Sequence, residues 1–125
     1  MLALLNNKPR LLLLDDDPSI QRLMATVLRR AGFRVDLVST GTAAIEKLAK
    51  IEYKALLLDV MTPTEGGFTV VRHLKKARPE LLHRVILVTA SPETVLKTVS
   101  GNVAAVVHKP FTPEQLVKTV RRVAK

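Results

Sequence analysis

Short apolar runs alternate with amphipathic segments along the whole of this 125-residue chain. The runs are typical of strands buried on both faces, and the segments between them repeat their apolar residues at helical spacing. The predicted strands are residues 11–14, 34–38, 55–58, 85–88 and 104–107. The predicted helices lie around residues 20–31, 44–49, 70–74, 95–99 and 116–123. Alternating strands and helices require parallel pairing with right-handed crossovers, so the pattern predicts an α/β sandwich of helix, sheet and helix layers.

Residues at the ends of the predicted helices agree with this pattern. Three helices begin with a capping residue followed by proline, at Asp17-Pro18, Ser91-Pro92 and Thr112-Pro113. Thr112 and Gln115 also have the spacing of a capping box. Gly32 follows the first helical stripe and predicts its C-terminal end. Local capping chemistry and hydrophobic periodicity therefore predict the same elements.

The composition indicates one globular domain. The chain is 47% apolar and 25% charged, which excludes disorder, and it is long enough to bury a sizeable core. It has no cysteine, which excludes disulfides and thiol chemistry and is compatible with a reducing compartment. The longest apolar runs have five residues, too few for a membrane span or a secretory signal. We therefore expect a cytoplasmic domain over residues 10–125, preceded by a short leader at residues 1–9.

The net charge indicates a basic surface and has no bearing on the predicted fold. Twenty Lys and Arg residues against eleven Asp and Glu residues make the formal charge +9, with a pI near 10.4. Such an excess is compatible with nucleic acid, an acidic membrane surface or an acidic protein partner. Only four aromatic residues are present to stack on bases, and no recognition motif is visible. Among these partners an acidic protein is favoured, and nucleic acid is not expected to bind this domain alone.

Candidate functional residues follow four of the five predicted strands. Asp15 and Asp16 follow the first strand, Asp59 the third, Thr89 the fourth and Lys109 the fifth. Ligands of open parallel sheets bind beyond the carboxyl ends of the strands, so these side chains are expected to converge there. Clustered carboxylates repel one another unless a cation neutralises them, and oxygen ligands suit Mg²⁺. A carboxylate can also accept a phosphoryl group, whose charge a lysine and a metal ion would stabilise.

Four motifs in order along the chain resemble one known family, the receiver domain of two-component response regulators. They are residues 11–18 (LLLLDDDP), 56–63 (LLLDVMTP) with Gly67, 85–90 (VILVTA) and 108–111 (HKPF). The resemblance covers residues 10–125. It implies a flavodoxin-like fold with strand order 2-1-3-4-5.

The resemblance also implies the roles of particular residues. Asp59 would be the phosphoacceptor, with Asp15, Asp16 and the Met61 backbone carbonyl as further ligands of Mg²⁺. Thr89 and Lys109 would complete the catalytic set, and the Lys109-Pro110 bond would be cis. Asp17 follows the acidic pair and is interpreted as a helix cap. Val106 occupies a position where the family usually carries an aromatic residue, so an output that works without such a ring is expected.

Two functions of different classes remain open. The leading hypothesis is a switch that takes a phosphoryl group from a histidine kinase or phosphotransfer protein and thereby changes its binding of a downstream protein. Slow hydrolysis of the phosphoryl group by the domain itself would reset the switch. It would not be an enzyme with a turnover substrate. The alternative is an interaction module of the same fold that signals by binding alone through its basic surface. A phosphohydrolase acting on free substrates is disfavoured because Met61 stands where a general acid would be wanted. We expect a monomer or weak dimer with no membrane contact.

Overall fold

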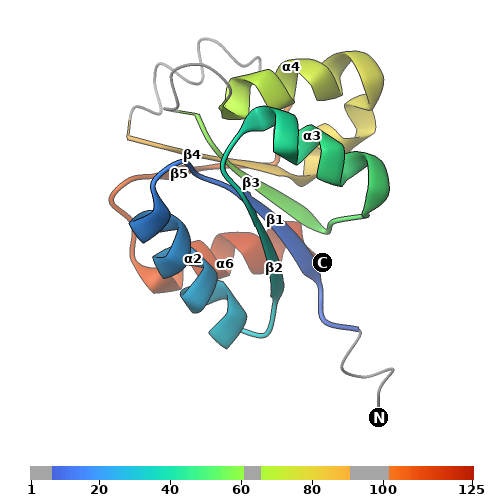
Figure 1. Cartoon of the computed structure of the whole chain (residues 1–125). Helices are drawn as coiled ribbons and strands as arrows, with labels where there is room; N and C mark the ends of the chain where they lie inside the picture. The colour runs from blue at the N-terminus through green and yellow to red at the C-terminus, as the bar shows by residue number, and fades with distance from the viewer. Residues whose placement is uncertain (1–6, 61–65, 91–101) are drawn as a thin grey trace.

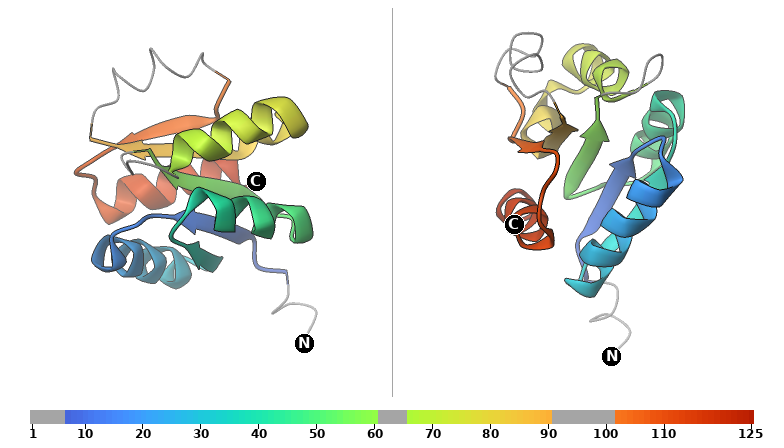
Figure 2. Two further views of the ribbon diagram at one scale, coloured as in Figure 1. Left: turned by 45° about the horizontal axis from the view of Figure 1, so that its top comes forward. Right: turned by 90° about the vertical axis from the view of Figure 1, so that its left-hand side faces the viewer.

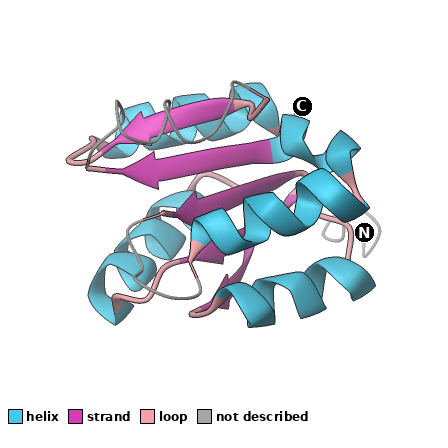
Figure 3. Cartoon of the chain, turned by 90° about the horizontal axis from the view of Figure 1, so that it is seen from above, coloured by secondary structure: helices cyan, strands magenta, loops and turns pink. Residues whose placement is uncertain are grey.

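The computed structural model describes residues 7–60, 66–90 and 102–125 and contains one five-stranded parallel sheet (Figure 1). The strands are β1 (Arg10–Leu14), β2 (Arg34–Val38), β3 (Ala55–Asp59), β4 (Val85–Thr89) and β5 (Ala105–His108). Their order across the sheet is β2-β1-β3-β4-β5, which confirms the predicted order. Seen from above, the strand arrows point in a common direction (Figure 3). Their carboxyl ends therefore lie along one edge of the sheet.

Helices cover both faces of the sheet. They are α2 (Pro18–Arg30), α3 (Gly41–Lys50), α4 (Gly67–Ala77) and α6 (Pro113–Val123), with a 3-10 helix η1 (Pro79–Arg84) before β4. Helices α3 and α4 pack on one face, and α2 and α6 lie side by side on the other (Figures 1 and 2). None of the helices in these described segments combines the length and the apolar character that a membrane crossing requires.

The central strands bury apolar side chains on both faces, as their uninterrupted aliphatic runs predict. Leu12 and Leu14 of β1 enter the core beneath α3 and α4, whereas Leu11 and Leu13 enter the core against α2 and α6. The same alternation continues in β3 and β4, because successive side chains of a strand point to opposite faces. Two apolar clusters thus hold the sheet between its helices.

The structure adjusts the predicted bounds of several elements. Strands β3 and β4 each extend one residue further than predicted, so Asp59 and Thr89 are the last residues of their strands. Strand β5 begins and ends one residue later than predicted. The 3-10 helix η1 was not predicted, because its six residues are too few to show a helical period. The helix predicted around residues 95–99 lies outside the described residues.

The predicted helix ends are confirmed where they are described. The Asp17 carboxylate accepts hydrogen bonds from the backbone N–H groups of Ser19 and Ile20. Thr112 and Gln115 form a reciprocal capping box at the start of α6. At the end of α2, Gly32 has a φ of 99°, and its N–H donates to the Arg29 carbonyl while the next N–H, of Phe33, donates to Leu28. These two bonds form a Schellman motif, which needs a left-handed residue at this position.

Replacement of Gly32 tests this helix end. Gly32→Ala is expected to lower the free energy of unfolding by about 1 kcal/mol, because an alanine side chain strains a left-handed backbone. A Cβ at Gly32 would meet no atom within 4 Å, so the loss would come from the backbone alone. Gly32→Asn is the matched control and should lose less, since asparagine adopts this conformation more readily. Urea unfolding measures both variants, and equal losses would contradict the backbone explanation.

A buried tyrosine and a carboxylate join β2 to the segment that leads into β3. The Tyr53 hydroxyl, in a side chain only 2% exposed, donates a 2.6 Å hydrogen bond to Asp36 Oδ2. Arg10 Nε donates to the same oxygen at 3.0 Å. Burial alone would raise the pKa of Asp36, but the hydrogen bonds from Tyr53 and Arg10 and the arginine charge lower it below its usual value. Burial and the bond to Asp36 raise the pKa of Tyr53.

This network predicts a pH-dependent contribution to stability. A carboxyl group with a lowered folded-state pKa stabilises the fold above its unfolded pKa of about 3.9, and this stability is lost as the pH falls through the folded-state value. Tyr53→Phe is expected to lower the free energy of unfolding at pH 7 by roughly 1.5–3 kcal/mol, the range for a hydrogen bond to a charged group. The difference from the wild type should narrow as urea titrations move from pH 5 toward pH 3. A constant difference would show that the Asp36 charge is not involved.

Candidate functional site

Four strand ends bring the predicted functional residues to the carboxyl edge of the sheet. Asp15 follows β1 directly, Asp59 ends β3, Thr89 ends β4, and Lys109 follows β5 directly. Asp15, Asp59 and Thr89 are 1%, 4% and 0% exposed, whereas Asp16 is exposed to solvent. The sheet therefore assembles these residues at one place although they are separated by up to 94 positions along the chain (Asp15 to Lys109).

The three carboxylates form one cluster with a lysine against it. Carboxylate oxygens of Asp15, Asp16 and Asp59 lie within 4.8 Å of one another. Lys109 Nζ lies 3.7 Å from Asp15 Oδ2 and 3.6 Å from Asp59 Oδ2. A single ammonium group thus faces both buried carboxylates and offsets only part of their negative charge.

Asp15 is the most constrained member of the cluster. Its Oδ1 accepts a 2.9 Å hydrogen bond from the Asp17 backbone N–H. Its buried Oδ2 faces Lys109 at 3.7 Å but accepts no hydrogen bond from the residues that the structure describes. Burial raises the pKa of Asp15 and the charge of Asp59 raises it further, while the Asp17 N–H and Lys109 act in the opposite direction. The net result is a pKa above the usual value for aspartate. The folded protein therefore holds a buried carboxylate whose negative charge is only partly compensated by the Asp17 N–H and Lys109.

This donor set fits a hard divalent cation. All the ligand atoms it offers are carboxylate oxygens, and two of the three carboxylates are buried. One buried oxygen accepts no hydrogen bond within the described part of the chain. Mg²⁺ prefers oxygen ligands and retains water molecules, which the exposed position of Asp16 would permit. Met61, the other predicted ligand, lies outside the described residues.

Backbone hydrogen bonds hold the strand ends in place. The Lys109 N–H donates to the Thr89 carbonyl at 2.8 Å, and the Asp15 N–H donates to the Val38 carbonyl at 3.3 Å. The peptide bond between Lys109 and Pro110 is cis, as the resemblance implied. The lysine is thus positioned by both β4 and the turn that follows β5.

Two residues support the site in ways that the sequence did not reveal. The Gln21 side-chain amide of α2 donates to the carbonyls of Asp15 and Val38, at 3.3 and 2.9 Å, and so ties the ends of β1 and β2 together. Gly67 lies so close to β3 that a Cβ would approach the Asp59 carbonyl oxygen to 2.9 Å. Gly67 belongs to the second of the four motifs, but its close packing against Asp59 leaves no local signal in the sequence. A half-buried polar residue on an amphipathic helix, such as Gln21, likewise has no sequence pattern that marks it as a support.

Comparison with known proteins identifies the family. The family model described as the response regulator receiver domain matches residues 11–121. The chain belongs to this family. Receiver domains are signalling switches of two-component systems. The matched residues 11–121 include all of the described strands and helices apart from Arg10 at the start of β1 and the last two residues of α6.

Relatives of known sequence and structure agree with this assignment. The transcriptional regulatory protein GltR of Pseudomonas aeruginosa is 33% identical over 117 residues, which are 92% of this chain and 48% of GltR. The DNA-binding response regulator MtrA of Mycolicibacterium smegmatis is 32% identical over 91% of this chain and 50% of its own. This receiver domain therefore spans about half the length of the curated relatives it matches.

Solved structures of isolated receivers match over nearly their whole length. The chemotaxis response regulator CheY4 of Vibrio cholerae is 29% identical, with a TM-score of 0.80, over 94% of this chain and 99% of its own. The receiver domain of the sensor histidine kinase PA1611 of Pseudomonas aeruginosa is 25% identical, with a TM-score of 0.81, over 94% and 98%. The latter structure is described as having a magnesium ion coordinated in the active site cleft.

Amide replacement of the acids tests the electrostatic cost of the cluster. In metal-free protein, Asp15→Asn is expected to raise the melting temperature of the receiver domain. The substitution removes a carboxyl group that burial makes costly to ionise, as its raised pKa indicates. Asp16→Asn should raise it less, since Asp16 is exposed. If Mg²⁺ binds this cluster, it should stabilise the wild type, because a ligand that binds only the folded state shifts the equilibrium toward it. Both variants should lose that stabilisation.

Asp17→Asn is the matched control for these variants, because asparagine caps a helix as well as aspartate does. It should leave the melting temperature and the response to Mg²⁺ nearly unchanged. A melting temperature of Asp15→Asn at or below that of the wild type would contradict the expected cost of the cluster.

Proposed function

We propose that this receiver domain is a phosphorylation switch in which Asp59 accepts a phosphoryl group from a phosphohistidine of a histidine kinase or phosphotransfer protein. An Asp59 oxygen would attack the phosphorus, the new P–O bond would form as the P–N bond breaks, and the imidazole would leave. The observation that carries the proposal is the buried pair of Asp15 and Asp59 facing one lysine ammonium at the carboxyl edge of the sheet.

The acidic residues are assigned to hold Mg²⁺. Asp15, Asp16 and Asp59 would supply its carboxylate ligands, and Met61 is proposed as a further ligand through its backbone carbonyl. When bound, the ion would neutralise the carboxylates and stabilise negative charge on the transferring phosphoryl group. Its place in the PA1611 receiver supports this assignment, because that receiver has the same fold and is 25% identical.

Lys109 and Thr89 complete the proposed site from the neighbouring strand ends. The Lys109 ammonium, 3.6 Å from Asp59 Oδ2, is positioned to bind a phosphoryl oxygen once Asp59 carries the group. Thr89 is fully buried at the end of β4, and we assign its hydroxyl to a second phosphoryl oxygen. Attack by water on the aspartyl phosphate would release phosphate and restore the Asp59 carboxylate, so the switch resets without turning over an external substrate.

The alternative function is signalling by protein binding alone, through the basic surface. The observation in its favour is the distribution of charge, since α2 carries no acidic residue and α6 carries one. Val106 of β5 is half-buried and packs against the core beneath α3 and α4. We propose that output by either route works without an aromatic ring at this position. A downstream protein partner is proposed in both cases.

Phosphorylation is measured by incubating the protein with Mg²⁺ and a small phosphodonor such as acetyl phosphate. Intact-mass spectrometry should show the addition of one phosphoryl group to the wild type and none to Asp59→Asn. Lys109→Ala should label at least tenfold more slowly, because it removes the only positive charge that the described residues place against the two buried carboxylates.

Asp17→Asn is again the control, since it makes the same chemical change next to the acidic cluster. It should be labelled at the wild-type rate. Equal labelling of Asp59→Asn and wild type would disprove the assignment of the phosphoacceptor. A wild type that is never labelled, although correctly folded and stabilised by Mg²⁺, would favour signalling by binding alone.

A further inference from the structure

Basic residues gather at the amino ends of three neighbouring strands, on the edge of the sheet opposite the carboxylate cluster (Figure 3). Arg34 begins β2, Arg10 begins β1, and Lys54 directly precedes β3. Arg10 and Arg34 are register partners, and the Lys54 N–H donates to the Arg10 carbonyl at 2.8 Å. Like charges on adjacent strands repel one another. The backbone of the sheet therefore holds together cations that would otherwise separate.

Two adjoining pockets at this edge are lined by these and further cations. The larger, of about 420 Å³, lies against the end of α2 and the start of β2, and the smaller has about 280 Å³. The larger pocket is within the range of ~300–1,000 Å³ that is typical of small-ligand sites. Among the described residues that line the two pockets, five are basic: Lys8, Arg10, Arg29, Arg34 and Lys54. This edge thus offers concave space bordered by positive charge.

The acidic residues that line these pockets, Asp36 and Glu52, are each paired with an arginine. Asp36 Oδ2 accepts a 3.0 Å hydrogen bond from Arg10 Nε and a 2.6 Å hydrogen bond from the Tyr53 hydroxyl. Glu52 Oε1 lies 3.4 Å from Arg84 Nη1, which also donates to the Tyr53 carbonyl. The negative charges of both carboxylates are therefore balanced within the protein, and Arg10 is engaged in doing so.

The other four basic residues form no ion pair with a carboxylate in the described part of the chain. These amino-edge cations are Lys8, Arg29, Arg34 and Lys54. Backbone acceptors fix two of them, because Arg29 Nη2 donates to the Val35 carbonyl at 2.8 Å and Arg34 Nε to the Lys8 carbonyl at 3.1 Å. Each bond uses one of the five donors of a guanidinium group and leaves its charge in place. An anion that binds these ordered groups loses less free energy in immobilising them.

The amino-edge cations fit a compact anion with several negative charges. Guanidinium groups match the oxygens of a phosphate group in charge and in geometry. A nucleobase would need an exposed aromatic face to stack on, but Phe33 and Tyr53, the aromatic residues that line the pockets, are only 7% and 2% exposed. The chemistry of this edge is thus suited to phosphate groups and indifferent to an attached base.

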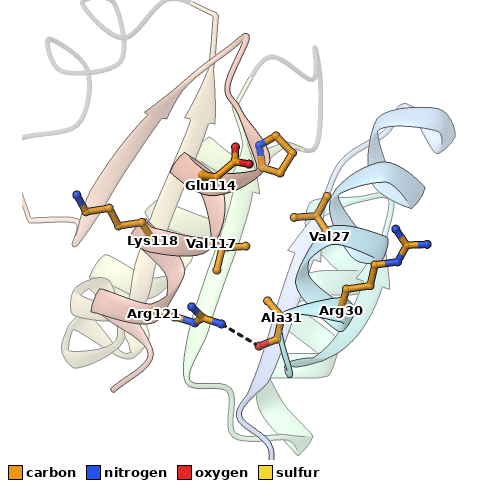
Figure 4. Close-up of a pocket in the computed structure, with 8 residues that line it drawn as sticks. Val27, Arg30, Ala31, Glu114, Val117, Lys118 and Arg121 are labelled. Atoms are coloured by element: carbon orange, nitrogen blue, oxygen red, sulfur yellow. Dashed lines mark hydrogen bonds between the residues drawn. The ribbon is translucent and has the colours of Figure 1, made fainter.

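The larger groove between α2 and α6, of about 660 Å³, differs in its chemistry (Figure 4). Figure 4 shows Val27 and Val117 directed toward one another across this α2–α6 groove, whereas Arg30 and Lys118 are directed away from each other. The facing walls are apolar and these two cations do not converge on them, so a phosphate group buried there would lack partners. Arg30 therefore provides a comparison for Arg29, its neighbour on the same helix.

We propose that the amino edge of the sheet binds a small anion with two or more linked phosphate groups. Lys8, Arg29 and Arg34 would bind phosphate oxygens in the larger pocket, and Lys54 would bind those that reach the smaller one. The ligand is an inorganic oligophosphate or the oligophosphate part of a nucleotide, because the site contacts only the chemistry that these share. None of the amino-edge cations belongs to the carboxylate cluster, so this binding is separate from the proposed phosphorylation of Asp59.

Calorimetric titration of the full chain with inorganic tripolyphosphate tests the proposal. Metal-free buffer of low ionic strength prevents chelation of a cation by the ligand and preserves the charge interaction. Tripolyphosphate is expected to bind, and orthophosphate to bind at least tenfold more weakly, because it meets fewer of the four cations. Adenosine triphosphate should bind within threefold of tripolyphosphate, since no aromatic face is offered to its base. The affinity for both should decrease as salt is added.

Paired variants of the arginines locate the site. Arg29→Gln with Arg34→Gln should weaken the binding of tripolyphosphate at least tenfold, because it removes two of the four amino-edge cations. Arg22→Gln with Arg30→Gln is the matched control. It removes the same charge from residues of α2 that do not line the two pockets, and it should weaken binding less than threefold.

A pair of lysine variants covers the case in which loss of the arginine bonds to backbone carbonyls destabilises the fold. Lys8→Gln with Lys54→Gln changes two exposed side chains, so the melting temperature of the ligand-free protein should stay unchanged. This variant should bind tripolyphosphate at least threefold more weakly than the wild type. Its control, Lys75→Gln with Lys76→Gln on α4, should keep the wild-type affinity.

Several outcomes would overturn the proposal. Failure of tripolyphosphate to bind the wild type, or equal affinity for orthophosphate, would exclude a site for linked phosphate groups. Equal weakening by each variant and its control would mean that the anion responds to the net charge of the protein. Displacement of tripolyphosphate by a short single-stranded DNA that binds at least tenfold more tightly would assign this edge to a nucleic-acid backbone. Asp59→Asn should bind tripolyphosphate as the wild type does, so a failure here is distinguishable from a failure of the phosphorylation site.

Discussion

Burial of two carboxylates next to a single ammonium group is the constraint on which the functional end of this fold depends. Asp15 and Asp59 are almost fully buried, and Lys109 Nζ lies 3.6–3.7 Å from both. Such a cluster persists only where the surrounding structure is strong enough to hold it. Here, parallel strands buried on both faces supply that strength, because their backbone bonds set the positions of the strand ends that carry the charged groups.

The cost of the cluster and its proposed function have the same physical origin. Asp15 Oδ2 is buried and accepts no hydrogen bond from the described residues, and burial raises the pKa of Asp15. Both features make the metal-free fold less stable than a fold with an uncharged group at this site would be. The same oxygen would gain a ligand bond if a divalent cation bound to the cluster. The supports of the site, Gln21 against the β1 end and Gly67 against Asp59, preserve this arrangement without adding charge. The apolar strands therefore supply the stability of the fold, whereas the polar residues at the strand ends form the candidate site.

The charge of the chain is divided between two regions with opposite sign. The acids that would hold a cation are gathered at one edge of the sheet, whereas the basic residues cover the helices, above all α2 and α6. A partner guided by the positive helices and a phosphoryl group directed to the acidic edge would use different surfaces of this receiver domain. This separation would allow the proposed binding of a protein and the proposed modification of Asp59 to be measured independently.

The sequence by itself determined the order and type of the described strands and main helices, because apolar periodicity and helix caps act over a few residues. It also predicted which residues meet at the carboxyl edge, since parallel strands must end together. Only the tertiary structure decided that Asp15 is buried and Asp16 exposed, that Gly67 touches the Asp59 backbone and that Gln21 ties two strands. The α2–α6 groove arose in the same way, from helices 82 positions apart at their ends (Ala31 to Pro113). Contacts of this kind depend on how distant segments pack, and that information is spread over the whole chain and is absent from any local pattern.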